Sequence, residues 1–310
     1  MRGRGLIRGD RVGLGWRTEL APSILSNPDQ IDAVEVILDD YFDSPISKLR
    51  ALSTLAGQVP VIYHGVGLGL ASSIEVDGRR LDRLARVLDY LAPDQWSEHL
   101  AFVRAGGIEI GHLAAPPRSE ATVHGALENL LRIKQAVGSL PALENIATLI
   151  DPPGSKLTEP EWVDGILSGS GCGLLLDLHN LYANAINFGF DPMHYLSAFP
   201  LQRVALVHLS GGKWIDEPAG FSGGSGNRNR ADGKRLLDDH VHDVPGIVFE
   251  MLEFLARKTL GPLTVILERD GEYPDFQVLL AQLARAREAI RRGRDQQASA
   301  EGGVLERARG

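Results

Sequence analysis

The sequence has almost no cysteine and no long apolar run. Cys172 is the only cysteine in 310 residues, so the chain cannot close a disulfide within itself, hold an iron–sulfur cluster alone or build a thiolate zinc cage. No stretch approaches the roughly 18 apolar residues of a membrane helix. The basic start, MRGRGLIRGD, has no apolar core behind it and is not a secretory signal. We expect a cytoplasmic protein without a membrane partner, in which histidines and carboxylates bind any metal.

Positive charge is also in deficit. The formal net charge is −8, which argues against nucleic acid as a partner because the phosphate backbone would be repelled. The content of 44% hydrophobic and 23% charged residues is ordinary for a folded protein of this length.

Short apolar, β-branched runs alternate along the chain with stretches of helical periodicity. The predicted strands are Val12–Trp16, Ala33–Leu38, Val59–His64, Trp96–Leu100, Pro141–Ile146, Gly173–Leu178, Arg203–Leu209 and Leu263–Arg269. Several are nearly all apolar, as in parallel strands that are buried on both faces. This pattern predicts an α/β fold with a single (β/α)8 TIM barrel over residues 1–293. A doubly wound sheet is the alternative, but Gly13-Leu-Gly15 does not open a glycine-rich phosphate turn.

Two segments do not fit the repeating pattern. Residues 210–235 are rich in glycine and follow the seventh predicted strand, so they form either a disordered insertion or a lid over a binding site. Residues 294–310 are polar and predict a flexible tail.

Ionisable side chains gather at the ends of the predicted strands. They are His64, Glu98, His99, Glu144, Asp177, His179, His208 and Glu268, with Asp270 just beyond. Active sites of TIM barrels lie at these carboxyl ends. Each residue alone is more often a core or ion-paired side chain, but together they would repel one another unless cations compensated them. Oxygen and imidazole ligands without thiolate suit Fe, Mn or Zn, and the many hard oxygen ligands favour Fe or Mn.

Four further polar residues lie close to this set in the sequence. Asp238 and His240 could add ligands from above the barrel, or they could cap a helix predicted to begin near Asp243. Asn145 and Asn180 adjoin predicted ligands and could bind metal weakly or orient their neighbours. His112, His124, His194 and His242 are expected at the surface.

Nine short motifs, in order, resemble those of a known family. They are Gly13-Leu-Gly-Trp-Arg17, Glu35-Val-Ile-Leu-Asp39-Asp-Tyr41, His64-Gly-Val-Gly-Leu68, Ser97-Glu-His-Leu100, Leu143-Glu-Asn145, Leu176-Asp-Leu-His-Asn180, His208-Leu-Ser-Gly211, Asp238-Asp-His240 and Leu267-Glu-Arg-Asp270. Together they are similar to the multinuclear non-haem iron-dependent oxidative enzymes (MNIO), which include the iron enzyme of methanobactin biosynthesis. The resemblance runs from about residue 11 to residue 276.

The resemblance implies a TIM barrel that holds two or three iron ions (Fe2+/Fe3+). It also implies O2-dependent oxidation of a ribosomal precursor peptide, commonly at cysteine, often with a separate leader-binding partner protein. The implied metal ligands are His64, Glu98, His99, Glu144, Asp177, His179, His208, Asp238, His240 and Glu268. This chain departs from the family at Leu20 and Gly212, where many members carry histidine, and at His179, where many carry asparagine.

Within this hypothesis we assign catalytic roles to Glu98, Asp177, Glu268 and Asp270, and substrate contacts to Arg17, Asn145, Asn180 and Trp214. Two other classes of protein stay open. A metal-dependent sugar isomerase or phosphodiesterase uses the same kinds of strand-end ligands, and a non-catalytic peptide-binding relative would tolerate the missing imidazoles.

Overall fold

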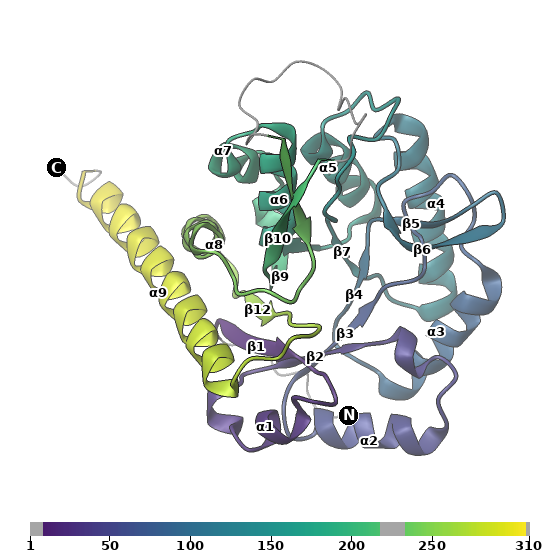
Figure 1. The fold of residues 1–310 in the computed structure, drawn as a ribbon, viewed down its shortest axis with the longest axis horizontal. Helices are drawn as coiled ribbons and strands as arrows, with labels where there is room; N and C mark the ends of the chain where they lie inside the picture. Colours follow the sequence, from purple (N-terminus) through teal and green to yellow (C-terminus); the bar gives the residue numbers. More distant parts are fainter. Residues whose placement is uncertain (1–8, 218–232, 308–310) are drawn as a thin grey trace.

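The computed structural model describes residues 9–217 and 233–307, with residues 301–307 as backbone alone. A closed barrel of eight parallel strands forms its centre, in the order β1-β12-β9-β8-β7-β4-β3-β2 (Figure 1). These strands are β1 (Arg11–Gly15), β2 (Val34–Ile37), β3 (Val61–Gly65), β4 (Trp96–His99), β7 (Ala142–Glu144), β8 (Leu174–Asp177), β9 (Val204–Leu209) and β12 (Thr264–Leu267). Each lies within two residues of a predicted strand, so the predicted (β/α)8 fold is confirmed.

Helices surround the barrel on its outer side (Figure 1). They are α1 (Ala21–Leu25), α2 (Ile46–Ala56), α3 (Gly78–Leu91), α4 (Glu120–Val137), α5 (Glu159–Ser170), α6 (Leu178–Phe188), α7 (Pro192–Ser197), α8 (Gly246–Lys258) and α9 (Phe276–Arg307), with 3-10 turns η1 (Pro28–Gln30), η2 (Asp39–Tyr41) and η3 (Leu201–Arg203). The start signals act as expected: Asp77 caps α3, and Ser119 forms a capping box with Thr122 at α4.

Apolar side chains form two separate clusters. The larger one fills the space between the strands and the helices and includes Trp96, Val163 and Met251. The smaller one consists of Ile62, Ala142, Leu175 and Leu206. Each of these four residues lies two positions before a predicted ligand on its strand. Because side chains two residues apart share one face of a strand, this small cluster forms an apolar floor beneath the ligands inside the barrel.

Two hairpins interrupt the alternation of strands and helices. β5 (Phe102–Ala105) pairs with β6 (Ile108–Ala114) after β4, and β10 (Gly212–Asp216) pairs with β11 (Lys234–Asp238) after β9. The expectation that residues 210–235 form a loop is therefore wrong at both ends of that segment, where ladder hydrogen bonds satisfy the backbone. Its centre, residues 218–232, lies outside the described residues, and the predicted lid falls on that part of the chain.

The predicted flexible tail needs correction as well. Helix α9 continues to Arg307, and Arg294 anchors it because its guanidinium donates to Asp10 and to the carbonyl oxygen of Gly261. A polar composition indicated disorder, but these bonds extend the helix past residue 293. Within the described residues, no helix is both long and apolar enough to span a membrane.

Asn129 on α4 holds the chain segment that follows β3. Its side-chain oxygen accepts from the amide of Val76 at 3.0 Å, and its nitrogen donates to the carbonyl oxygens of Leu70 and Ile74 at 3.2 and 3.0 Å. The side chain is buried, so its loss would leave these backbone groups without partners.

We expect Asn129→Ala to lower the free energy of unfolding by at least about 2 kcal/mol, because each buried polar group left unpaired costs about 1–3 kcal/mol. Urea unfolding followed by circular dichroism measures this change. Gln277→Ala, at an exposed helical position, is the control and should change stability by less than about 0.5 kcal/mol. Equal effects of the two substitutions would contradict this interpretation.

Candidate metal centre

The strand register places the predicted ligands in one layer inside the barrel. His64 pairs with Ser97, His99 pairs with Glu144, and Asp177 pairs with His208. Paired residues of parallel strands point to the same face of the sheet. The convergence of imidazoles and carboxylates above the apolar floor therefore follows from the barrel itself.

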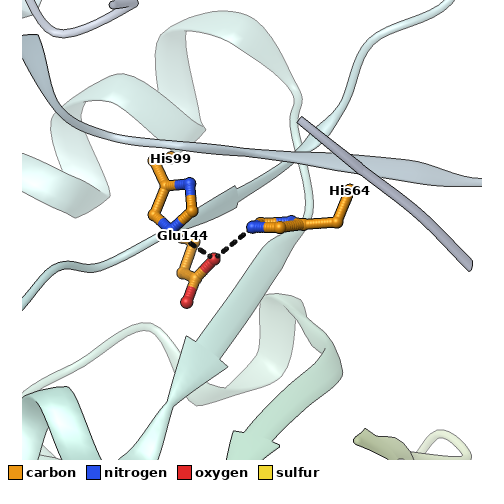
Figure 2. Close-up of side chains that lie close together, drawn as sticks. All are labelled: His64, His99 and Glu144. Carbon is orange, nitrogen blue, oxygen red and sulfur yellow. Dashed lines mark ion pairs between the residues drawn. The ribbon is translucent and has the colours of Figure 1, made fainter. Parts of the chain in front are cut away.

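The first group of candidate ligands consists of His64, His99 and Glu144, whose ligating atoms lie within 4.8 Å of one another. The Nε2 atoms of His64 and His99 lie 3.2 and 3.3 Å from the same oxygen, Oε2 of Glu144 (Figure 2). The Nδ1 atoms point elsewhere: that of His64 lies 2.8 Å from the Ser97 hydroxyl, and that of His99 lies 3.2 Å from the carbonyl oxygen of Gly65. Both rings thus direct Nε2 at one carboxylate.

The second group consists of Glu144, Asp177, His208 and Glu268, again within 4.8 Å. The Nδ1 atom of His208 lies 3.1 Å from Oε1 of Glu144 and 3.2 Å from Oε2 of Glu268. Glu144 belongs to both groups and turns one oxygen toward each. A carboxylate in this position can bridge two metal ions.

Several atoms that face one another in these groups are buried and make no hydrogen bond. They are Nε2 of His64, Oε2 of Glu144, Oδ2 of Asp177 and Oε2 of Glu268. Burial of such atoms without partners is costly. The close contacts between His64 and Glu144 are short in distance but lack hydrogen-bond geometry. Nitrogen and oxygen atoms arranged in this way fit cation binding, and the donor set suits a divalent transition metal.

The pKa values of the site also reflect the burial of these groups. Burial raises the pKa of Asp177 well above its usual value, and the nearby Asp238, Glu144 and Glu268 raise it further. Burial alone would lower the pKa of His208, but Glu268, Glu35 and Glu144 raise it well above its usual value. The raised pKa values favour the protonated forms of Asp177 and His208, so a cation that binds here competes with protons.

A second polar network crosses the barrel mouth. Asp238 on β11 lies 2.7 Å from Nδ1 of His179 and 2.7 Å from Nε2 of His240. Nδ1 of His240 lies 3.1 Å from Asp270, which accepts from Nε of Arg17 at 2.9 Å. Asp238 and His240 do not cap a helix, since α8 begins at Gly246 without a side-chain cap. These residues adjoin the two groups but are not members of them.

Glu98 is the predicted ligand that the register turns away. It pairs with Gly65 and Leu143, whereas its neighbours Ser97 and His99 pair with residues of the inward layer. A Cβ atom on Gly65 would lie 2.4 Å from Oε2 of Glu98, so this side chain fills space that a glycine leaves on the outer face. Burial and the nearby Asp39 raise the pKa of Glu98 well above its usual value. Neither metal-ligand group includes it.

Asn145 and Asn180 hold the end of β8. Asn145 donates to the carbonyl oxygen of Asp177 and accepts from its amide, at 3.0 and 2.9 Å. The backbone amide of Asn180 donates to Oδ1 of Asp177 at 2.6 Å. The side chain of Asn145 thus holds the backbone of Asp177, whereas the bond from Asn180 is the backbone N-cap bond of α6, and the Asn180 side chain donates to the carbonyl oxygen of Asn145. Of the other predicted substrate contacts, Trp214 is 46% exposed on β10 and Arg17 pairs with Asp270 at the mouth.

A cavity of about 250 Å³ opens beside the two groups. Its polar side is formed by His99, Glu144, Asn180, Asp238 and His240, and its apolar side by Leu113, Ile146, Leu149, Leu236 and Leu237. It lies between the ends of β6 and β11, so both hairpins contribute to its walls. A substrate in this cavity would lie directly against His99 and Glu144.

Sequence reasoning named Glu35 of β2 within a family motif but assigned it no role in the site. Its carboxylate is fully buried, and Oε2 lies 2.8 Å from Nε2 of His208. The available signal was a single charge inside the apolar run Ala33-Val-Glu-Val-Ile37. Of the other histidines, His112, His124, His194 and His242 are exposed as expected. Leu20 packs into the larger apolar cluster.

Comparison with known proteins identifies the family. The family of RiPP precursor modification enzymes MbnB/TglH/ChrH, which act on precursors of ribosomally made, modified peptides, matches residues 11–291. The chain belongs to this family. The resemblance to MNIO enzymes, expected from nine short motifs, is confirmed.

Several bacterial proteins are similar to this chain at moderate identity. A UPF0276 protein of Streptomyces avermitilis is 35% identical over 290 residues, which cover 90% of this chain and 55% of that protein. A UPF0276 protein of Acaryochloris marina is 30% identical over 276 residues, which cover 89% of this chain and 93% of that protein. This chain therefore spans about half the length of the Streptomyces relative and nearly all of the other.

Solved structures with this architecture include sugar epimerases. An L-ribulose 3-epimerase superposes with a TM-score of 0.56 at 13% identity and covers 95% of this chain and 98% of its own. A D-psicose 3-epimerase gives 0.54 at 13% identity, with 93% and 99% covered. At this identity the similarity shows the shared barrel fold alone.

If Glu144 bridges two ions, its loss should affect both. We expect Glu144→Gln to reduce bound divalent metal at both groups, and His99→Ala to reduce it at one, because His99 belongs to a single group. Metal analysis per chain after anaerobic reconstitution measures this. Glu159→Gln, a buried carboxylate on α5 outside both groups, is the control. Retention of two ions by Glu144→Gln would contradict the shared role.

Proposed function

We propose that this protein is a multinuclear non-haem iron enzyme that uses O2 to oxidise a ribosomal precursor peptide, at a cysteine residue. The observation that supports this most strongly is Glu144, one buried carboxylate shared by two adjoining ligand groups. Two ions held this close can act on one substrate. Membership of a family of RiPP precursor modification enzymes supports a peptide as the substrate.

The ligand chemistry favours iron. The second group has three carboxylates and one imidazole, and the first has two imidazoles and one carboxylate. Hard oxygen ligands stabilise a higher oxidation state, while neutral imidazoles limit the negative charge. When bound, iron would supply a binding site for the substrate thiolate and for O2, and electrons for the reduction of O2.

The chain's own residues supply the surroundings of that chemistry. Glu144, Asp177 and Glu268 would hold positive charge in place, and the side chain of Asn145, with the backbone amide of Asn180, would keep Asp177 aligned. The apolar wall of the cavity would exclude water from the reacting sulfur. At the mouth, His179, Asp238 and His240 complete the proposed ligand shell, and Asp270, Arg17 and Trp214 are proposed to meet the peptide. A separate leader-binding protein would deliver the remainder of that peptide.

Two results would favour the other classes of protein. Uptake of manganese or zinc but not iron, without O2 consumption, would indicate an isomerase or phosphodiesterase. Loss of stability alone on ligand replacement would indicate a non-catalytic peptide-binding relative.

Anaerobic purification followed by metal analysis and Mössbauer spectroscopy tests the iron centre, and we expect at least two irons per chain. Glu268→Ala should lose iron and with it all measurable O2-dependent mass change of a cysteine-containing precursor peptide, because Glu268 is a ligand of the second group. Glu250→Ala, an exposed carboxylate on α8, should keep both. Full iron content and full turnover in Glu268→Ala would show that the assignment is wrong.

A further inference from the structure

Glu35 lies inside the barrel, where a carboxylate is costly. It pairs in register with Ile62 of the apolar floor, so its side chain projects from the floor layer rather than from the ligand layer above. Its exposure is 0%. Its Oε1 atom has no hydrogen-bond partner. Burial of a half-satisfied carboxylate at this place calls for a compensating role.

The contact of Glu35 with His208 indicates what that role is. Oε2 of Glu35 lies 2.8 Å from Nε2 of His208, and both side chains are at most 1% exposed. The other ring nitrogen, Nδ1, faces the oxygens of Glu144 and Glu268 at 3.1 and 3.2 Å. The imidazole thus stands between one carboxylate below it and the ligand group beside it.

With a metal ion bound, this arrangement would select one tautomer of the ring. A carboxylate accepts a hydrogen bond, so Nε2 must carry the hydrogen that points to Glu35. Nδ1 also faces carboxylate oxygens, those of Glu144 and Glu268. A metal ion at the second ligand group would take the place of the hydrogen on Nδ1 and bind that nitrogen's lone pair, while Nε2 keeps its hydrogen toward Glu35. Carboxylates that hold metal-binding histidines in this way commonly increase metal affinity 10- to 100-fold.

We propose that Glu35 is a positioning residue of the metal centre, which acts through His208 by fixing its tautomer and ring orientation for a metal ion at Glu144, Asp177 and Glu268. The inference depends on the proposed function only for the identity of the metal. Ser97 occupies the corresponding place for His64, with its hydroxyl 2.8 Å from Nδ1, but it carries no charge. The two groups therefore differ in how strongly their histidines are held.

The test is an anaerobic titration of the metal-free, full-length protein with Fe2+ in competition with a chromophoric chelator. In Glu35→Gln we expect one ion to bind about 10- to 100-fold more weakly and the other to keep its affinity. The amide keeps the volume of the carboxylate, but it can donate to Nε2 as well as accept from it, so it no longer selects one tautomer. Glu159→Gln is the matched control for a buried carboxylate and should bind both ions as the wild type does.

A double-mutant cycle separates positioning from general stabilisation. His208→Ala should lose the same ion, and adding Glu35→Gln to it should change the remaining binding by less than about threefold, because the residue through which Glu35 acts is gone. Wild-type affinity in Glu35→Gln would overturn the proposal. So would equal weakening of both ions, or a further loss in the His208→Ala background.

Two additions keep the outcome clear. Thermal unfolding of each metal-free variant checks that it folds. If Glu35→Gln does not fold, Glu35→Asp replaces it, because its side chain is one methylene too short to reach Nε2. We expect Glu35→Asp to show the same selective weakening. The titration is repeated with Mn2+ and Zn2+. If the wild type takes up no Fe2+ but Glu35→Gln selectively weakens the binding of Mn2+ or Zn2+, the proposed iron chemistry is wrong and the proposed role of Glu35 is supported.

Discussion

The burial of carboxylates around Glu144 is the constraint on which the rest of this structure depends. Glu144, Asp177 and Glu268 are at most 5% exposed, and like charges at such short range destabilise one another in a medium of low dielectric. His208, whose pKa the carboxylates raise, brings compensating charge, and His64 and His99 bring nitrogen ligands for a cation. The folded barrel holds these groups together against their repulsion, and the apolar floor below them keeps water out.

Register within the barrel decides which polar residues take part. Ser97, Glu98 and His99 are adjacent in sequence. Ser97 and His99 nevertheless face the barrel interior, whereas Glu98 faces the layer outside the barrel. Glu35 does the reverse: a charge within an apolar strand that faces inward and reaches a ligand from below. A motif such as Ser97-Glu-His99 therefore contains two kinds of residue, and its letters alone do not separate them.

Much of the fold and most of the inward ligands follow from the sequence. The eight strands are recognisable because they are short, apolar and regularly spaced, and His64, Glu144, Asp177 and His208 mark or immediately follow their ends. Which residues of a strand point into the barrel cannot be read from the sequence when both faces of the strand are buried, because apolar residues occupy both faces. For this reason Glu98 was included among the predicted ligands and Glu35 was given no role. The hairpin β10–β11 and the end of α9 were not predicted for another reason. Glycine and polar residues indicated irregular chain, but ladder hydrogen bonds and the contacts of Arg294 provide order that composition does not show.

The same barrel serves sugar epimerases, so the particular character of this centre lies in what surrounds the shared strands. The hairpin β10–β11 provides Asp238, which joins His179 of α6 to His240 and accepts from the hydroxyl of Ser210. At Gly212 a Cβ atom would lie 2.6 Å from Cε1 of His179 and 2.2 Å from the carbonyl oxygen of Leu237. The imidazole of His179 thus occupies the space that a side chain at position 212 would need. Gly212 and His179 therefore form a single packing arrangement, which keeps an imidazole at the mouth of the barrel.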